Sequence, residues 1–85
     1  MRLTGEARRS LDALPAKVYF AVVEFLGGSL ADNPLRAGHA LQRDLAGLHS
    51  AWRSEYRVVY EVREDEREVV VHRVQHRRDV YRPTA

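Results

Sequence analysis

The chain has 85 residues, a formal net charge of +2 and no cysteine; 45% of its residues are apolar and 31% are charged. This balance is typical of one small globular domain over residues 1–85, and it excludes a disordered chain, a disulfide framework and a cysteine nucleophile. No apolar run reaches the roughly 18 residues that cross a bilayer, and the N-terminus lacks the apolar segment of a secretory signal, so we expect a cytoplasmic protein.

The first half of the chain predicts a short edge strand followed by two helices. Thr4 is a suitable N-cap for a helix over residues 5–14, whose apolar residues recur at helical spacing. A second helix covers residues 15–26. The pair Gly27-Gly28 is expected to end this helix, because glycine readily adopts the left-handed conformation of a helix end. Short helices joined this closely form an antiparallel helical hairpin.

The second half of the chain changes to the spacing of strands. Residues 29–47 are expected to form a loop. The leucines expected to attach this loop to the core are Leu35, Leu41, Leu45 and Leu48. A short strand is expected over residues 49–53. Residues 56–63 and 68–75 form longer strands, joined by an acidic hairpin turn at residues 63–67.

Alternation within residues 56–63 places Tyr56 and Tyr60 on one face of the strand and Arg57 on the other. The fold class is therefore α+β, in the order βααβββ, with the helical hairpin packed on one face of an antiparallel sheet. The opposite face is expected to be open to solvent and to carry Arg57.

Basic charge is concentrated near the end of the chain. The basic residues of segment 73–82 are Arg73, Arg77, Arg78 and Arg82, against one acid, Asp79. Arginine presents a rigid fork of donors that matches phosphate oxygens, so this segment suits an anionic partner. Composition alone is better explained by an arginine-rich solvated surface.

Three segments resemble the RelE/ParE superfamily of toxins from type II toxin–antitoxin modules: residues 44–48 (DLAGL), 55–60 (EYRVVY) and 74–81 (VQHRRDVY). The last segment is more similar to RelE-like than to ParE-like toxins. The resemblance implies a fold of the microbial ribonuclease type. It also implies a toxin that enters the ribosomal A site and cuts mRNA, with the 2′-hydroxyl of the scissile nucleotide as nucleophile and no metal. The implied partner is a RelB-like antitoxin from a neighbouring gene, bound in a hetero-oligomer.

The resemblance also assigns functional residues. Arg57 and Arg77 match arginines that stabilise the negative charge developing on the phosphate, and Tyr81 matches a tyrosine that stacks on a base. The best-known RelE toxins carry a basic pair on the open face of the preceding strand. Those two positions are occupied here by Ser50 and Trp52.

The chemistry of the residues extends this candidate site. His76, next to Arg77, is the favoured acid or base because imidazole titrates near neutrality, and His49 is the second candidate. Further contacts to RNA are expected from Arg53, Arg73, Arg78 and His49. Arg53 is one residue out of phase with the open face unless a bulge turns it round.

Several alternatives stay open. Arg57 alone would also fit an ordinary ion pair on a sheet surface. Trp52 is either a packing residue of an edge strand or a ring that stacks on a base, and His72 is expected to be structural. The four histidines lack metal-ligand spacing, and no glycine-rich phosphate loop is present, so we expect no metal and no cofactor. The alternative functions are a ParE-like inhibitor of DNA gyrase and a degenerate toxin that only binds its antitoxin.

Overall fold

The structure is a computed structural model that describes residues 1–80. In chain order, the helices and strands of this part are β1 (Arg2–Leu3), α1 (Gly5–Asp12), α2 (Ala16–Phe25), α3 (Pro34–Ala37), β2 (His39–Ala40), β3 (His49–Arg53), β4 (Tyr56–Arg63), β5 (Glu68–His76) and α4 (Arg77–Val80). No helix within residues 1–80 is long and apolar enough to span a membrane.

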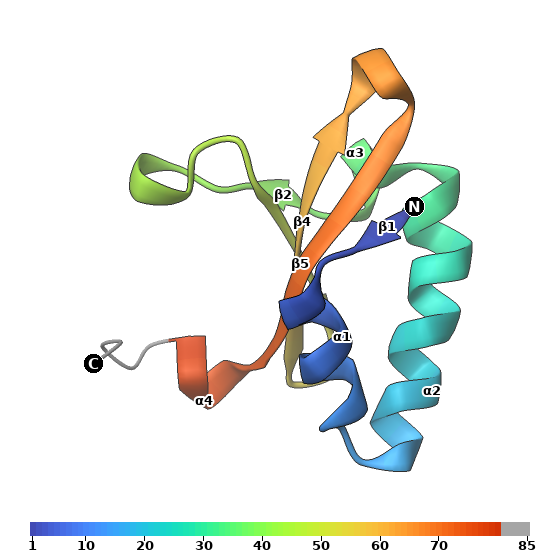
Figure 1. Cartoon of the computed structure of the whole chain (residues 1–85). Helices are drawn as coiled ribbons and strands as arrows, with labels where there is room; N and C mark the ends of the chain where they lie inside the picture. The colour runs from blue at the N-terminus through green and yellow to red at the C-terminus, as the bar shows by residue number, and fades with distance from the viewer. Residues whose placement is uncertain (81–85) are drawn as a thin grey trace.

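The five strands form one sheet in the order β1-β5-β4-β3-β2 (Figure 1). β1 runs parallel to β5, with Arg2 opposite Val70, and the other neighbouring strands are antiparallel. The α+β class and the antiparallel meander of β3, β4 and β5 are thereby confirmed. The sheet is wider than the expected one and mixed, because β2 extends one side and β1 joins the other side in parallel.

Helices α1 and α2 cover one face of the sheet, as Figure 1 shows. Their apolar stripes meet the inward-facing strand residues in one core, whose enclosed members include Ala7, Val22, Val58, Tyr60 and Val71. Tyr60 is fully buried and Tyr56 packs against the same core, so the expectation that both tyrosines face the helices is confirmed. Burial of these apolar side chains provides the main stabilisation of the fold.

Helix α1 is attached to the outer edge of β5 by two hydroxyl side chains. Thr4 is the predicted N-cap: its Oγ1 accepts from the N–H of Ala7 at 3.1 Å and donates to the carbonyl of His72 at 2.9 Å. The Ser10 hydroxyl accepts from the N–H of Val74 at 3.1 Å. These bonds satisfy backbone N–H and C=O groups of β5 that the two-residue β1 does not pair, so α1 protects this edge of β5.

The expected helix end at Gly27-Gly28 is wrong. The helix continues through a π-helical turn, Leu26–Leu30, and stops before Pro34. Glycine permits the left-handed conformation but does not require it, and neither glycine has a positive φ. Leu30 is fully buried, so the extra turn is stabilised by packing, whereas Pro34 disfavours helix at the residue before it.

Residues 29–47 are more ordered than the expected loop. Pro34 begins α3, which suits its fixed φ and its missing N–H, and β2 follows. Leu35 is 51% exposed and does not attach the segment to the core, contrary to expectation. The half-buried leucines outside the main core cluster are Leu41, Leu45 and Leu48. They lie in the β2–β3 loop (residues 41–48), which protrudes from the sheet in Figure 1.

A β-bulge interrupts the pairing of β4 with β5. Val59 lies opposite Arg73, whereas the next residue, Tyr60, lies opposite Val71, so His72 is the extra residue. Val71 and Val74 both belong to the helix-covered core, although they are three positions apart. A strand with a strict two-residue period cannot place both on one face, so the bulge changes the phase of β5.

Candidate nucleic-acid interface

The sheet face turned away from α1 and α2 is called the open face here. Its alternating residues on the three central strands are Ser50, Trp52, Arg57, Val59, Glu61, Arg63, Glu68, Val70, Arg73 and Gln75. In Figure 1 the β2–β3 loop and α4 both project on this side of the sheet. Ser50 and Val59 are buried, whereas Arg57, Arg73 and Gln75 are half-buried. Trp52 is exposed, so the open face is accessible at Trp52 and, in part, at its basic residues.

Arg57 occupies the middle row of this face. It lies between Trp52 on β3 and Gln75 on β5, which are its register partners on the two neighbouring strands. Its Nη2 donates to Oε1 of Gln75 at 3.0 Å. This bond draws the guanidinium toward β5 and limits its rotamers. Gln75 is not predicted as a site residue from the sequence, because only the register shows which residue of the last strand faces Arg57.

Arg73 places a second guanidinium on the open face. It lies two residues before Gln75 and opposite the buried Val59. Its Nε is buried and has no hydrogen-bond partner within residues 1–80. Arg73 and Arg57 thus present two positive charges on adjacent strands of one face.

The end of β5 leads directly into α4, which carries two more predicted residues. Arg77 begins α4, two residues after Gln75, and its backbone N–H donates to the carbonyl of Glu55 at 2.7 Å. This bond fastens α4 to the turn between β3 and β4. Arg77 and Arg78 are both exposed. The predicted base-stacking residue, Tyr81, lies outside the described residues.

His76, the favoured acid or base, lies on the helix-covered side of the sheet rather than beside Arg57. It is the register partner of Tyr56, and the two rings meet edge to face at 5.0 Å. Its Nε2 lies 3.2 Å from a carboxylate oxygen of Glu55, and its Nδ1 accepts from the N–H of Arg78 at 3.2 Å. The structure therefore does not bring His76 and Arg57 together.

Arg53 and His49 also face the helices. The guanidinium of Arg53 lies over the ring of Phe25, 3.8 Å from its centroid, and its Nη1 donates to the carbonyl of Trp52. His49 stacks on Tyr60 at 5.5 Å. No bulge turns Arg53 round, so the structure places these two predicted RNA contacts on the face opposite Arg57 and Arg73.

An ion-pair network occupies the open face beyond the bulge. Glu61 contacts Nε2 of His72 and Nε of Arg63, each at 3.2 Å, and Arg63 also lies 3.7 Å from Glu66. The hydrogen bonds from His72 and Arg63 hold the pKa of the Glu61 carboxyl below its usual value. This network sets the carboxylates of Glu61 and Glu66 against the guanidinium of Arg63, so the positive charge of the open face lies around Arg57 and Arg73.

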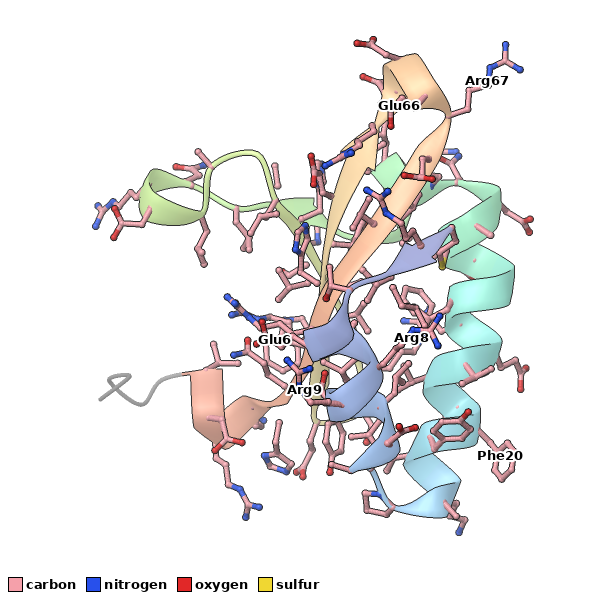
Figure 2. All side chains as sticks on the ribbon, in the orientation of Figure 1. Glu6, Arg8, Arg9, Phe20, Glu66 and Arg67 are labelled. Atoms are coloured by element: carbon pink, nitrogen blue, oxygen red, sulfur yellow. The ribbon has the colours of Figure 1, made fainter. Side chains whose placement is uncertain are left out.

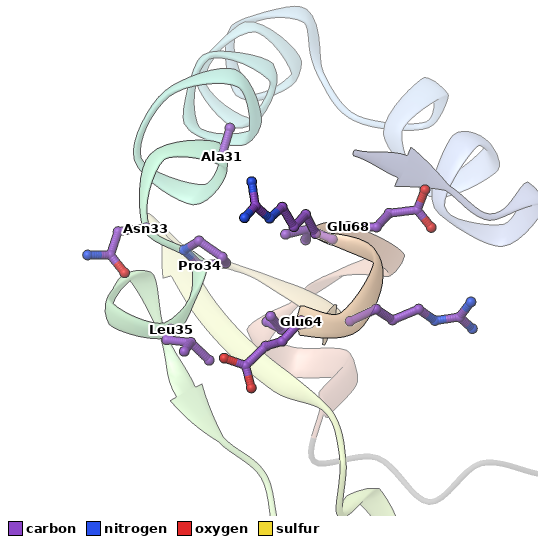
Figure 3. Close-up of a pocket in the computed structure, with 10 residues that line it drawn as sticks. Ala31, Asn33, Pro34, Leu35, Glu64 and Glu68 are labelled. Atoms are coloured by element: carbon purple, nitrogen blue, oxygen red, sulfur yellow. The ribbon is translucent and has the colours of Figure 1, made fainter.

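A separate pocket of about 340 Å³ lies between α3 and the turn that joins β4 to β5 (Figure 3). Its lining residues are Ala31, Asn33, Pro34, Leu35, Val62, Arg63, Glu64, Arg67, Glu68 and Val69. It mixes both signs of charge and contains none of the predicted site residues. Within residues 1–80, no group of three or more histidine, cysteine, aspartate or glutamate side chains could hold a metal ion.

Comparison with known proteins supports the same assignment as the three motif segments. Residues 1–81 match the family described as ParE toxin of type II toxin-antitoxin system, parDE. The chain is 48% identical over 82 residues to Toxin RelG of Mycobacterium tuberculosis, covering 96% of this chain and 94% of RelG. It is 44% identical over 80 residues to Toxin RelE of the same organism, covering 94% and 82% of the two chains.

The fold agrees with these sequence matches. A solved chain of the toxin-antitoxin complex RelBE2 from Mycobacterium tuberculosis superimposes with a TM-score of 0.86 at 47% identity, covering 89% of this chain and 94% of that one. The resemblance to RelE/ParE toxins is therefore confirmed. Since both the match to the family and the identities extend over almost the whole sequence, this chain belongs to the family of ParE toxins of type II toxin–antitoxin systems.

Proposed function

We propose that this toxin is a metal-independent endoribonuclease that acts in the cytoplasm, enters the A site of the ribosome and cuts the bound mRNA. The observation that carries the proposal is the pair of arginines, Arg57 and Arg73, on a sheet face bounded by the β2–β3 loop and α4. The hydrogen bond from Arg57 to Gln75 prepares one guanidinium before any ligand binds. Preorganised charge of this kind is what a phosphoryl transition state requires.

The proposed reaction is attack of a 2′-hydroxyl on the neighbouring phosphate: the O2′–P bond forms, the P–O5′ bond breaks, and the products are a 2′,3′-cyclic phosphate and a 5′-hydroxyl, with the 2′-hydroxyl losing a proton to water and the 5′-oxygen taking one up. The phosphate gains negative charge as the new bond forms. Arg57 contacts this charge from the sheet and Arg77 from the start of α4, because guanidinium stays protonated and binds phosphate oxygens in a bidentate manner. Tyr81 stacks on a base and orients the strand. Arg73 and Arg78 bind neighbouring phosphates of the mRNA.

Proton transfer is the weaker part of this site. Ser50 and Trp52 stand where related toxins carry a basic pair, and neither is a base. His76 would serve as acid or base only if it left the helix-covered side of β5, where its ring nitrogens contact Glu55 and the N–H of Arg78. We therefore expect the rate enhancement to come mainly from charge stabilisation and from orientation of the 2′-hydroxyl.

We also propose that a RelB-like antitoxin from a neighbouring gene neutralises the toxin in a hetero-oligomer. The similar RelBE2 structure is a toxin-antitoxin complex. In the present chain, α2 exposes apolar residues on its outer side, with Phe20 68% and Val23 40% exposed. Figure 2 shows Phe20 pointing away from the sheet. An amphipathic helix of the antitoxin would cover such residues.

The test is cleavage of mRNA on purified ribosomes, followed by primer extension. We expect Arg57→Ala and Arg77→Ala each to slow cleavage about 10²- to 10³-fold, as for the loss of a donor that stabilises transition-state charge. Arg8→Ala is the matched control, because it removes the same charge from an exposed position of α1. If Arg57→Ala cleaves as fast as the control while remaining folded, the site assignment is wrong.

Inhibition of DNA gyrase is the second candidate function. It is favoured by the loss of the basic pair at Ser50 and Trp52 and by the family's description as ParE toxins. Induction of such a toxin would leave transcripts uncut and trigger a DNA damage response. A chain that produced neither effect but bound its antitoxin tightly would be a degenerate toxin.

A further inference from the structure

Trp52 is the large aromatic side chain of the open face that the proposed reaction leaves without a role. It is 39% exposed and lies directly opposite Arg57 on the neighbouring strand. The sequence is compatible with two roles of this residue: packing on an edge strand, or stacking on a base. The structure distinguishes between them.

The surroundings of Trp52 do not support a packing role. It is not a member of the helix-covered core or of the partly buried residues packed against that core. Within residues 1–80 no aromatic ring stacks on the indole or meets it edge to face. The bond from Arg53 reaches the backbone carbonyl of Trp52 and not its ring. β2 pairs only with His49 and Ser50, so the strand edge beside Trp52 is also unpaired within this part of the chain.

The indole and the Arg57 guanidinium are complementary parts of a nucleotide site. Neighbouring strands lie about 4.8 Å apart, so the two side chains rise from adjacent points of the same face. The hydrogen bond to Gln75 holds one nitrogen of the guanidinium toward β5, while Trp52 lies on β3, the neighbour of β4 on its other side. One nucleotide can therefore place its base on the ring and its phosphate at the guanidinium.

We propose that Trp52 is a stacking platform for an unpaired base of single-stranded RNA, next to the phosphate that Arg57 binds. The inference rests on the proposed function and names a base subsite within it. A flat ring beside a cation is the arrangement that binds single strands with little sequence preference, because every base has a π-face. Trp52 thus adds binding and orientation where related toxins place a base catalyst.

The test uses the intrinsic fluorescence of the protein, since the chain contains a single tryptophan. A short RNA with 2′-O-methyl groups at every sugar cannot be cut, so its binding is measured without cleavage. We expect this RNA to quench the fluorescence of Trp52 to saturation. An RNA of equal charge with abasic sites should bind more weakly and quench less. Arg57→Ala should weaken the binding but leave the quenching at saturation.

Variants then measure the contribution of the ring by anisotropy of a labelled RNA. Trp52→Ala is expected to weaken binding roughly five- to 150-fold, as for the loss of one stacked base, whereas Trp52→Phe should retain most of the affinity. A far-UV spectrum and a thermal unfolding curve of both variants show that they are folded. The phenylalanine variant keeps the test valid if the alanine variant does not fold.

Three outcomes would overturn the inference: no binding of RNA by the folded toxin, binding without quenching, or equal RNA affinity of Trp52→Ala and the unchanged protein. Equal RNA affinity together with weakened binding of the antitoxin would assign the ring to the protein interface instead. The proposed function fails separately. A toxin that binds and quenches but does not cut mRNA would retain the base subsite and lose the ribonuclease assignment.

Discussion

Gly38 lies where β2 approaches the sheet so closely that no side chain fits. A Cβ atom at this position would overlap the backbone carbonyl of Ser50 and would lie 2.8 Å from the hydroxyl of Tyr60. A backbone group cannot rotate away, so Gly38→Ala must push β2 off β3. That movement strains the pairing of His39 with Ser50 and the 2.7 Å hydrogen bond from Tyr60 to the carbonyl of Pro34.

Overpacking of this kind costs about 1–3 kcal/mol, and a weakened hydrogen bond adds about 1 kcal/mol. We therefore expect Gly38→Ala to lower the free energy of unfolding by about 2–4 kcal/mol and Tm by roughly 10 °C or more. Urea unfolding followed by circular dichroism measures the first quantity, and a thermal melt the second.

Gly27→Ala is the matched control, because the substitution is the same and a Cβ at Gly27 meets nothing within 4 Å. Gly27 is exposed in a helical segment, so alanine should stabilise the protein by about 0.5–1 kcal/mol. Opposite signs for the two variants are the expected result. If Gly38→Ala changed stability by less than about 0.5 kcal/mol, the close approach of β2 to Ser50 would be refuted.

Three further predictions concern single contacts. Ser10→Ala leaves the N–H of Val74 without its acceptor, so urea unfolding should show a loss of about 1–2 kcal/mol, while Ser10→Thr should lose less. Tyr60→Phe removes the bond to Pro34 and should cost about 1–2 kcal/mol. Because burial raises the pKa of Tyr60, stability of the unchanged protein should fall above pH 10 more steeply than that of Tyr60→Phe; parallel curves would contradict this. Hydrogen bonds from His72 and Arg63 lower the pKa of the Glu61 carboxyl from its ordinary value, so the ionised carboxylate stabilises the fold near neutral pH. The difference in unfolding free energy between the unchanged protein and Glu61→Gln should therefore disappear as the pH falls and the carboxylate is protonated.

The interpretation from sequence succeeded where a rule depends only on neighbouring residues. The hydroxyl of Thr4 caps α1 as expected, since a cap bonds the N–H three residues later. Strict alternation along β4 and β3 placed Arg57, Ser50 and Trp52 on one face and Arg53 on the other, and the register agrees. The acidic turn between the last two long strands also forms where it was expected, as a 3-10 turn over residues 64–66.

The tertiary structure decided what depends on distant partners. The helix passes Gly27-Gly28 because Leu30 has a place in the core, and a local signal for a helix end does not contain that information. The bulge at His72 sets the phase of β5, so Gln75 faces Arg57 and His76 faces the helices. Alternation determines the two faces of one strand, but only the pairing of strands determines which residues of two strands share a face. The sequence by itself therefore determined the two long helices, the three longer strands and their chemistry, and the register between them decided which groups meet.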